Sequence, residues 1–421
     1  MKDAYVCAGV RTPFVKSLGH YQGVTTQELM TASLQALIEK ANLQGQILGD
    51  VALGAVMISS ADWNLARECV LGTNLHPWTP AYNVQRACGT GLETINHIAM
   101  KIKTGQIEWG IGGGVDTNTD LPILYPRSFG RKAIAMNMSK SLGQRLQAAL
   151  RFRLGDFKPV FPGVVEPRTG LSMGQHCERM VKEWNVGRQE QDQLAYESHK
   201  KGAAAYDAGF YNDLVIEFKG LRRDPILRAD TSLEKLAKLK PAFDLSGQGT
   251  LTAGNSTALT DGSSVVLLAS EERAQKHGLS RLARFVDCES AALNYVSGEG
   301  LLMAPTVAVS RLLKRNNLQL QDFDFYEIHE AFAGQVLCTL NAWKDREFCE
   351  KFLDRTQPLG EIDRSKLNVM GGSVALGHPF AATGGRIVAT LAHLLKRKGK
   401  GRGLISICTA GGMGVAAILE A

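Results

Sequence analysis

Two cysteines and a histidine stand beside glycines in this chain, and residues of these types could together carry out acyl transfer. Cys88 lies in Arg-Ala-Cys-Gly-Thr-Gly, His378 in Gly-His-Pro, and Cys408 in Cys-Thr-Ala-Gly-Gly-Met-Gly. Glycine lets the backbone approach a ligand closely and adopt positive φ angles. A cysteine thiolate is a nucleophile, and a neutral imidazole can take the proton of the thiol. The three motifs therefore indicate thiol-based acyl transfer.

Cys88 has the setting of a nucleophile, although a buried structural thiol is the usual state of a free cysteine. It precedes a helix-like stretch with apolar residues at Leu92, Ile95 and Ile98. The positive end of a helix dipole favours a thiolate at such a position. From the local sequence alone, a nucleophile and a core cysteine both remain open.

Three further residues could carry protons or hold an oxygen atom. The proline after His378 keeps the histidine backbone extended, and this histidine is either a base or a satisfied core residue. Cys408 closes an apolar strand before a glycine turn, so it is either a proton shuttle or part of the strand core. His329 stands at a strand-to-helix junction and could hold a water or a carbonyl oxygen. Ala333 occupies the second histidine position of HExxH, which excludes a zincin motif.

Short apolar runs alternate with helix-period segments, which predicts a layered α/β fold. The same order of features, a reactive residue, a helix and then a glycine-rich strand or turn, follows Cys88 and again follows His378. This is a weak internal repeat. It suggests two similar halves that each supply part of one site. The predicted strands are 5–10, 50–56, 109–115, 264–269, 283–287, 325–328, 404–408 and 414–420, and the predicted helices are 26–41, 92–104, 188–209, 304–316, 330–343 and 385–398.

Composition restricts the compartment and the partners. The eight cysteines form no CxxC pair, so neither a zinc ribbon nor a thioredoxin-type motif is present, and free thiols fit a reducing compartment. The chain enters a strand near its start without a leader-like segment, so a cytoplasmic protein is expected. The net charge of +7 suits an anionic surface or a polyanionic ligand. Because no nucleic-acid-binding module is recognisable, nucleic acid is not expected as a partner.

A basic segment interrupts this pattern. Residues 127–158 hold eight basic residues and one acidic residue, and leucines recur at 142, 146, 150 and 154. This spacing predicts one helical stripe over 140–153 with a basic opposite face. Three interpretations are open: a surface helix packed on its own domain, a helix that contacts a membrane surface or a partner protein, or a contact with ligand phosphates.

Taken together, the motifs resemble those of the thiolase family over nearly the whole chain, in the same order and with the same spacing. Within the family the closest resemblance is to the thiolase (β) subunits of fatty-acid β-oxidation multienzyme complexes. His-Glu-Ala-Phe from His329, where many thiolases have Asn-Glu-Ala-Phe, points to these subunits, as do the segments 139–146 and 236–243. The further matching motifs are Arg-Thr-Pro-Phe from Arg11, Gly-Gly-Gly-Val-Asp to Asp116, Thr-Ala-Gly-Asn-Ser-Thr from Thr252 and Gly-Gly-Ser from Gly371.

The resemblance implies an acyltransferase that cleaves 3-oxoacyl-CoA with CoA, which is a substrate and not a cofactor; no metal is implied. Cys88 would be the nucleophile, His378 its base and Cys408 the second acid and base. His329 and His378, with a held water, would stabilise the enolate and thioester oxygen. The N–H groups of Cys88 and Ala410 would form the hole for the tetrahedral oxyanion. Matching positions for CoA contact are Met173, Gly254 and Thr257.

The resemblance also implies the thiolase fold: two α/β halves, each a mixed five-stranded sheet between helices, stacked in five αβαβα layers. The halves would be residues 1–124 plus 250–271 and residues 272–421. A loop domain over 125–249 would bind CoA and could contact a membrane or partner. We expect a homodimer or higher homo-oligomer. The further expected partners are a hydratase/dehydrogenase α-subunit and a membrane surface, contacted peripherally through 140–153.

Two residues depart from the pattern of the thiolase family. Ala410 and Ala381 stand where glycine is common in thiolases, which matters only if the backbone there needs positive φ.

The main alternative function is a biosynthetic acetoacetyl-CoA thiolase. A decarboxylating ketoacyl synthase is disfavoured because Cys408 stands where that chemistry normally needs a histidine. A catalytically silent acyl-CoA carrier is disfavoured because Cys88, His378 and Cys408 are all present.

Overall fold

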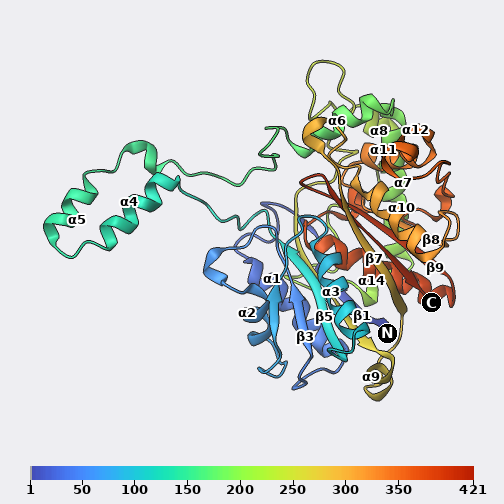
Figure 1. The fold of residues 1–421 in the computed structure, drawn as a ribbon, viewed down its shortest axis with the longest axis horizontal. Coiled ribbons are helices and arrows are strands. Elements are labelled where there is room, and N and C mark those ends of the chain that lie inside the picture. The colour runs from blue at the N-terminus through green and yellow to red at the C-terminus, as the bar shows by residue number, and fades with distance from the viewer. Residues whose placement is uncertain (1) are drawn as a thin grey trace. The chain divides into compact units, whose positions relative to one another are not determined.

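The computed structural model describes residues 2–421 and shows two compact units (Figure 1). The larger unit comprises the chain up to Thr119 together with Val165–Ala421, and the smaller comprises Asp120–Val164. The role predicted for an inserted domain over 125–249, CoA binding and contact with a membrane or partner, stays a prediction. By its contacts, the chain from Val165 onward belongs to the same compact unit as the two halves, and only residues 120–164 form the second unit.

Strands of the larger unit form one continuous mixed sheet in the order β4-β3-β5-β6-β1-β7-β10-β9-β8, and β2 pairs with β6 off this path. The two halves of the chain meet where β1 pairs with β7 at only two positions, Tyr5 with Arg284 and Val6 with Ala283. The strands are β1 Ala4–Arg11, β2 Val15–Lys16, β3 Asp50–Leu53, β4 Ala81–Asn83, β5 Trp109–Asp116, β6 Thr260–Ser270, β7 Ala283–Ala292, β8 Phe325–Ile328, β9 Arg402–Thr409 and β10 Met413–Glu420.

The N-terminal half has the expected five strands on the sheet path, and the C-terminal half has four. The N-terminal half supplies β4, β3, β5, β6 and β1 to the sheet path, whereas the C-terminal half supplies β7, β10, β9 and β8. A single parallel bridge between Tyr326 and Leu367 lies beside β8, where a fifth strand would pair. The chain after Leu367 turns away at Asn368, whose φ of 44° is incompatible with an extended strand.

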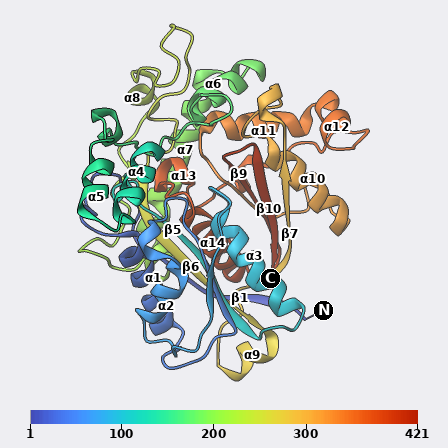
Figure 2. The same ribbon diagram turned by 60° about the vertical axis from the view of Figure 1, so that its left-hand side comes forward.

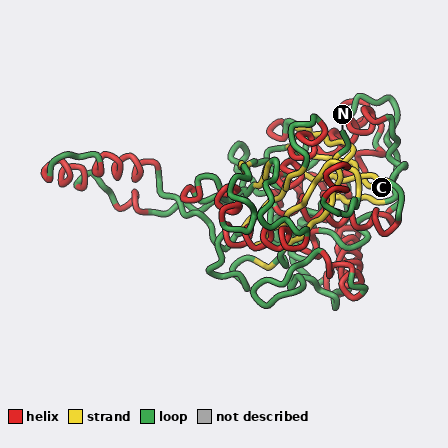
Figure 3. The backbone as a smooth tube through the Cα atoms, turned by 90° about the horizontal axis from the view of Figure 1, so that it is seen from below, coloured by secondary structure: helices red, strands yellow, loops and turns green. Residues whose placement is uncertain are grey.

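Helices complete five layers around three apolar cores (Figure 2). α1 and α2 cover one face of the N-terminal half, α3 and α14 lie between the halves, α10 covers the far face of the C-terminal half, and α11 packs against α10. Alternate residues of β10 serve two cores: Val415, Ala417 and Leu419 face α14, whereas Ala416 and Ile418 belong to the outer core. In the larger unit, Figure 3 shows the strands enclosed by helices.

Fourteen helices occur among the described residues, with capping patterns typical of their ends. α1, for example, begins with a capping box in which Thr25 and Glu28 exchange hydrogen bonds. The helices are α1 Thr26–Lys40, α2 Leu65–Leu71, α3 Thr90–Lys103, α4 Arg127–Asn137, α5 Leu142–Ala149, α6 Met173–Glu183, α7 Arg188–Asp207, α8 Leu233–Ala237, α9 Glu271–Lys276, α10 Ala304–Asn316, α11 Ala333–Lys344, α12 Arg346–Phe352, α13 Ser373–Leu376 and α14 Ala382–Lys398.

α3 and α14 approach each other to backbone contact at glycines. A Cβ atom at Gly384 would lie 2.1 Å from the backbone nitrogen of Leu92, and one at Gly91 would lie 2.4 Å from the carbonyl oxygen of Ala381. Any side chain at these positions would push the helices apart. The close contact brings together the turns that precede the two helices, and these turns carry Cys88 and His378.

Every predicted strand and helix has a counterpart, although several bounds differ by a few residues; the helix predicted over 385–398, for example, begins at Ala382. The helix predicted over 330–343 begins at Ala333. The helical stripe predicted over 140–153 is wrong in length: α5 ends at Ala149, Leu150 is its C-cap, and a 3₁₀ turn follows at Leu154–Phe157. Within residues 2–421, no helix combines the length and the apolar character that a membrane crossing needs.

The 120–164 unit has a small aromatic core of its own. Phe129, Phe152 and Phe157 pack with ring centroids 5.5 Å apart. Lys132 Nζ lies 2.6 Å from a carboxylate oxygen of Asp156, and that carboxylate also accepts the backbone N–H of Arg153. The unit therefore has folded contacts, yet the leucines of its predicted stripe remain exposed. The exposed fractions of Leu142, Leu146, Leu150 and Leu154 are 82%, 65%, 81% and 94%.

Candidate active site

Cys88 occupies a strained turn that opens α3. Ala87, the residue before it, has a φ of 45°, and such a backbone in a non-glycine residue costs about 1–3 kcal/mol. Thr90 stabilises the turn: its hydroxyl accepts the N–H of Arg86 at 2.8 Å and donates to the carbonyl of Ala87 at 2.7 Å. Gly89 caps the helix. The turn presents a half-buried thiol at the start of the helix.

His378 is held at three atoms in the turn before α14. Its backbone N–H donates to Thr260 Oγ1 at 2.8 Å, and its ring Nδ1 lies 2.5 Å from Thr383 Oγ1. Its other ring nitrogen, Nε2, lies 3.2 Å from Cys88 Sγ. Gly377 before it has a φ of 95°, which only glycine adopts readily. The structure thus brings together two residues separated by 290 positions in the sequence.

The Cys88–His378 pair is neutral at rest. Burial raises the pKa of Cys88 to about 12, although the backbone N–H groups of Ala410 and Cys88 itself favour the thiolate. Burial, assisted by the positive charge of Arg386, lowers the pKa of His378 to about 3. The sequence favoured a thiolate at this helix start, but loss of solvation outweighs the helix end and the N–H groups. Both shifts favour a neutral thiol and a neutral imidazole over a thiolate–imidazolium pair.

His329 lies beside His378 with one ring nitrogen unpaired. Its ring centroid is 4.1 Å from that of His378, and it is 1% exposed. Nδ1 lies 2.7 Å from Ser373 Oγ, whereas Nε2 has no hydrogen-bond partner among residues 2–421. Because a buried polar atom without a partner is costly, Nε2 is suited to hold a water or a substrate oxygen.

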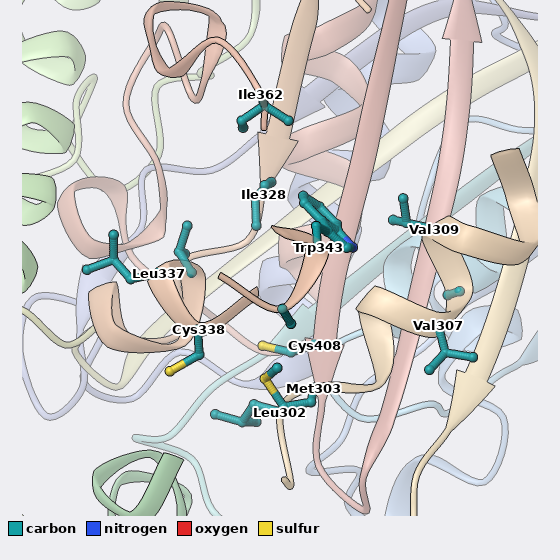
Figure 4. Close-up of a cluster of buried hydrophobic side chains, with 14 of the residues drawn as sticks. Leu302, Met303, Val307, Val309, Ile328, Leu337, Cys338, Trp343, Ile362 and Cys408 are labelled. Atoms are coloured by element: carbon teal, nitrogen blue, oxygen red, sulfur yellow. The ribbon is translucent and has the colours of Figure 1, made fainter. Parts of the chain in front are cut away.

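Cys408 lies near the end of β9, within reach of both the site and the outer core. Burial and the neighbouring Cys88 raise the pKa of its thiol, while the N–H of Ala331 favours its thiolate. Figure 4 shows Cys408 beside Met303 and Cys338 in that core. Cys408 is therefore part of the strand core, its thiol lies near enough to Cys88 for that residue to raise its pKa, and its role as a proton shuttle stays a prediction.

The turn after Cys408 tolerates alanine. Among the described residues, Gly411 and Gly412 carry positive φ angles of 78° and 70°, and Ala410 does not. Ala381, the other departure from the family, has an ordinary helical φ of −66°. Glu166 stabilises the turn because its carboxylate accepts the N–H of Gly411 at 2.7 Å. The backbone N–H of Ala410 is therefore retained beside the Cys88 sulfur.

The three positions matched to CoA contacts have definite places, and their role toward CoA stays a prediction. Thr257 donates its hydroxyl to the carbonyl of Ser373 at 2.9 Å. Gly254 packs closely under Leu236 and Leu239. Met173 is half-buried at the first position of α6.

The sequence did not reveal the residues that support the site. Asp116 accepts the N–H groups of Val56, Met57 and Ala381 and so links the His378 turn to β5; burial raises the pKa of its carboxyl to about 7. Thr383 and Ser373, which contact the two histidines, lie within a few residues of His378, but neither residue type suggested a role. For Thr383 the nearness to a reactive histidine was the signal, and Ser373 also stood in the matching Gly-Gly-Ser motif.

Comparison with known proteins places the chain in the thiolase family. The family model "Thiolase, N-terminal domain" matches residues 4–272, and "Thiolase, C-terminal domain" matches residues 279–421. The chain is 40% identical to proteins named 3-ketoacyl-CoA thiolase from Shewanella sp. (strain W3-18-1) and Shewanella pealeana, over 99% of this chain and 96% of each relative. The chain therefore belongs to the thiolase family.

Solved structures agree with this assignment. The Bacillus anthracis acetyl-CoA acetyltransferase superimposes with a TM-score of 0.82 at 31% identity, and the human mitochondrial 3-ketoacyl-CoA thiolase with 0.81 at 29%. Each comparison covers 100% of this chain and 99% of the other chain. The predicted α/β thiolase fold is confirmed.

Proposed function

We propose that this protein is a 3-ketoacyl-CoA thiolase, an acyltransferase that cleaves 3-oxoacyl-CoA with CoA into acetyl-CoA and an acyl-CoA shortened by two carbons. The observation that carries the proposal is the contact of 3.2 Å between Cys88 Sγ and His378 Nε2, in a chain 40% identical over nearly its full length to relatives of that name. The contact supplies a nucleophile and its base in one site.

The first half-reaction transfers the acyl group to Cys88. The thiol proton moves to His378 Nε2 while the sulfur attacks the 3-keto carbon, and the N–H groups of Cys88 and Ala410 hold the oxyanion. The bond between C2 and C3 then breaks, and its electron pair passes into the enolate of acetyl-CoA. His329, through Nε2, stabilises the enolate oxygen, and Cys408 delivers a proton to C2. Acetyl-CoA leaves and Cys88 remains acylated.

The second half-reaction returns the enzyme to its starting state. The thiolate of Cys408 takes the proton of an incoming CoA thiol, and the CoA sulfur attacks the acyl carbon on Cys88. The tetrahedral intermediate uses the same two N–H groups. When it collapses, the Cys88 sulfur leaves and recovers its proton from His378. Both thiols and the neutral imidazole are thereby regenerated.

The assay that tests this proposal measures CoA-dependent cleavage of 3-oxohexadecanoyl-CoA and of acetoacetyl-CoA, with the Cys88→Ala variant as control. Strong preference for the long substrate, lost in the variant, is the expected result. Acetoacetyl-CoA preference would assign the biosynthetic alternative, which the similarity to an acetyl-CoA acetyltransferase structure at 31% identity supports. Failure to cleave either substrate in a Cys88-dependent manner would leave an acyl-CoA carrier.

The expected partners form a second part of the proposal: a homodimeric or larger core in the cytoplasm, joined by a hydratase/dehydrogenase subunit, with peripheral contact to an anionic membrane surface. The supporting observation lies in the 120–164 unit. Four leucines of this unit are 65–94% exposed, and the eight basic residues of 127–158 are near them in the sequence. Exposed apolar side chains beside cations suit an anionic lipid surface.

Neutralising Arg145, Arg151 and Arg153 to glutamine tests the membrane and partner contacts. We expect weaker sedimentation with vesicles containing phosphatidylglycerol, or loss of a co-purifying subunit. The matched control neutralises three exposed cations of the larger unit, Arg222, Lys314 and Arg346, which are 67–79% exposed. If the 145/151/153 variant kept both kinds of binding, this part of the proposal would fail while the thiolase activity would stand.

A further inference from the structure

We propose that Ser373 and Arg386 keep the proton of His329 on Nε2, so that this histidine enters the reaction as a hydrogen-bond donor. Ser373 and Arg386 are then positioning residues that act through His329 and do not touch the substrate. The inference deepens the proposed function and rests on it, since the oxygen that receives the hydrogen bond belongs to the substrate of that reaction.

The three side chains form a buried chain of hydrogen bonds. Arg386 Nη2 lies 2.8 Å from Ser373 Oγ, and Ser373 Oγ lies 2.7 Å from His329 Nδ1. Arg386 is 2% exposed, Ser373 is 0% exposed and His329 is 1% exposed. Water therefore does not compete for these contacts, and each polar atom depends on the partners the protein supplies.

The direction of the chain follows from what each group can donate. A guanidinium donates hydrogen bonds and never accepts them, so the Ser373 oxygen accepts from Arg386. The serine hydroxyl proton is then free to point at His329 Nδ1, which accepts it. In the opposite tautomer, Nδ1–H and Arg386 would both donate to Ser373 Oγ, and the buried hydroxyl proton would have no acceptor among the contacts found within residues 2–421. That unmet donor makes the opposite tautomer unfavourable.

This hydrogen-bond direction determines the state of the other ring nitrogen of His329, Nε2. With Nδ1 accepting, a neutral His329 carries its proton on Nε2, the atom that has no partner among the described residues. An N–H at this position can donate to a developing oxyanion, whereas a bare nitrogen would repel it. The main-chain N–H of His329 donates to Ser406 at 2.8 Å, which keeps the ring in register with β9.

Arg386 is retained in the interior by acidic neighbours. Burial lowers the pKa of Arg386, and the nearby carboxyl groups of Glu327 and Glu330 oppose that shift. Glu330 is itself fixed by Asn368, Ser198 and the N–H of Val374. An arginine is suited to this place because its charge, and with it the direction of the hydrogen-bond chain, does not change with pH.

The two neighbouring histidines are therefore set for opposite tasks. His378 must accept the proton of Cys88 at Nε2, and His329 must donate from Nε2, although their ring centroids are 4.1 Å apart. Each Nδ1 faces a hydroxyl, of Thr383 or Ser373. The difference is that only the Ser373 hydroxyl has a guanidinium bonded to its oxygen.

A double-mutant cycle tests the inference. Ser373→Ala should lower kcat for 3-oxoacyl-CoA cleavage roughly tenfold, the weight of about one hydrogen bond in choosing the tautomer, and leave KM nearly unchanged. His329→Asn replaces the ring by an amide that carries N–H donors in any protonation state. In that background, adding Ser373→Ala should change kcat less than about twofold. Equal losses from Ser373→Ala in both backgrounds would overturn the inference.

A spectroscopic measurement separates this inference from the proposed function. In protein labelled with ¹⁵N-histidine, the His329 ring should show the shifts of an Nε2–H tautomer, assigned by comparison with the His329→Asn variant. In Ser373→Ala the two nitrogen shifts should move toward a mixture of tautomers. An Nδ1–H tautomer in the unaltered protein would overturn the inference even with full activity. If the protein lacked thiolase activity but showed the Nε2–H signature, the proposed substrate would fail and the hydrogen-bond chain would stand.

Discussion

The turn before α3 and the turn before α14 occupy comparable places in the two halves, yet they prepare their residues differently. Each turn leads into a helix of the middle layer that is followed by a central strand, β5 or β9. Cys88 is half-buried and is presented by a strained residue, Ala87. His378 is 4% exposed and is bonded at its backbone N–H and at both ring nitrogens.

The repeated fold places one reactive side chain before a middle-layer helix in each half. The residues around each turn then determine what that side chain can do. In the proposed mechanism the nucleophile must admit an acyl carbon: Cys88 is only half-buried, and its turn is fixed through the hydroxyl of Thr90. The base needs a fixed tautomer and orientation, so its ring is bonded on both sides. Each of the following predictions tests one of the two turns or the contact between the helices that follow them.

Removing either reacting residue should have the largest effect. Cys88→Ala and His378→Ala should each lower kcat at least about 10⁴-fold, and the double variant should be little worse, because residues that act as a unit are not additive. Steady-state thiolysis measures the loss. The two variants should differ in one respect: His378→Ala keeps a thiol that iodoacetamide can label at high pH. Additive losses would show that the two turns act independently.

The neutral state of the pair predicts how alkylation of Cys88 depends on pH. Because the pKa of Cys88 is raised to about 12 and that of His378 is lowered to about 3, the reactive thiolate fraction should grow about tenfold per pH unit between pH 6 and 9. The rate is measured with iodoacetamide and mass spectrometry, and the Cys88→Ala variant corrects for labelling of the other thiols. A rate independent of pH over this range would indicate a thiolate–imidazolium pair and contradict the prediction.

The contact between the helices that carry both turns can be tested with one methyl group. Gly384→Ala places a Cβ against the backbone nitrogen of Leu92, which should lower the free energy of unfolding by about 2 kcal/mol and increase the distance between Cys88 and His378. Urea denaturation and kcat together measure the two effects. Gly187→Ala is the matched control, since nothing lies within 4 Å of its added Cβ. Equal stability of the two variants would refute the argument from close approach.

Much of the fold could be predicted because its signals are local. Apolar runs predicted the central strands, and glycine motifs singled out Cys88, His378 and Cys408 as candidates, whereas Ala410 was suggested only by the resemblance to thiolases. Strands β2 and β4 were missed because two and three residues are too few to show alternation. The helices α4 and α6, of 11 residues each, were not predicted either. The end of α5 at Ala149 was also missed, because the leucine spacing continues past the point where the helix stops.

The supporting shell of the site could not be predicted because its contacts are not local. Ser198 reaches the segment at Gly372 from α7, and Glu166 reaches the Gly411 turn across 245 positions. Serine, threonine and glutamate at such positions resemble ordinary surface residues in a sequence. The packing of the halves makes them part of a site, and that packing is a property of the whole chain.

Thr383→Val should have the smallest effect and tests the histidine side most directly. Valine has nearly the shape of threonine but removes the oxygen that lies 2.5 Å from His378 Nδ1. The ring then loses its partner at Nδ1, and its orientation toward Cys88 is less firmly fixed. A loss of about tenfold in kcat with little change in KM is expected for one buried hydrogen bond. Thr383→Ser retains the hydroxyl and should restore most of the activity; if serine and valine were equally impaired, packing of the methyl group, and not the hydrogen bond, would fix the base.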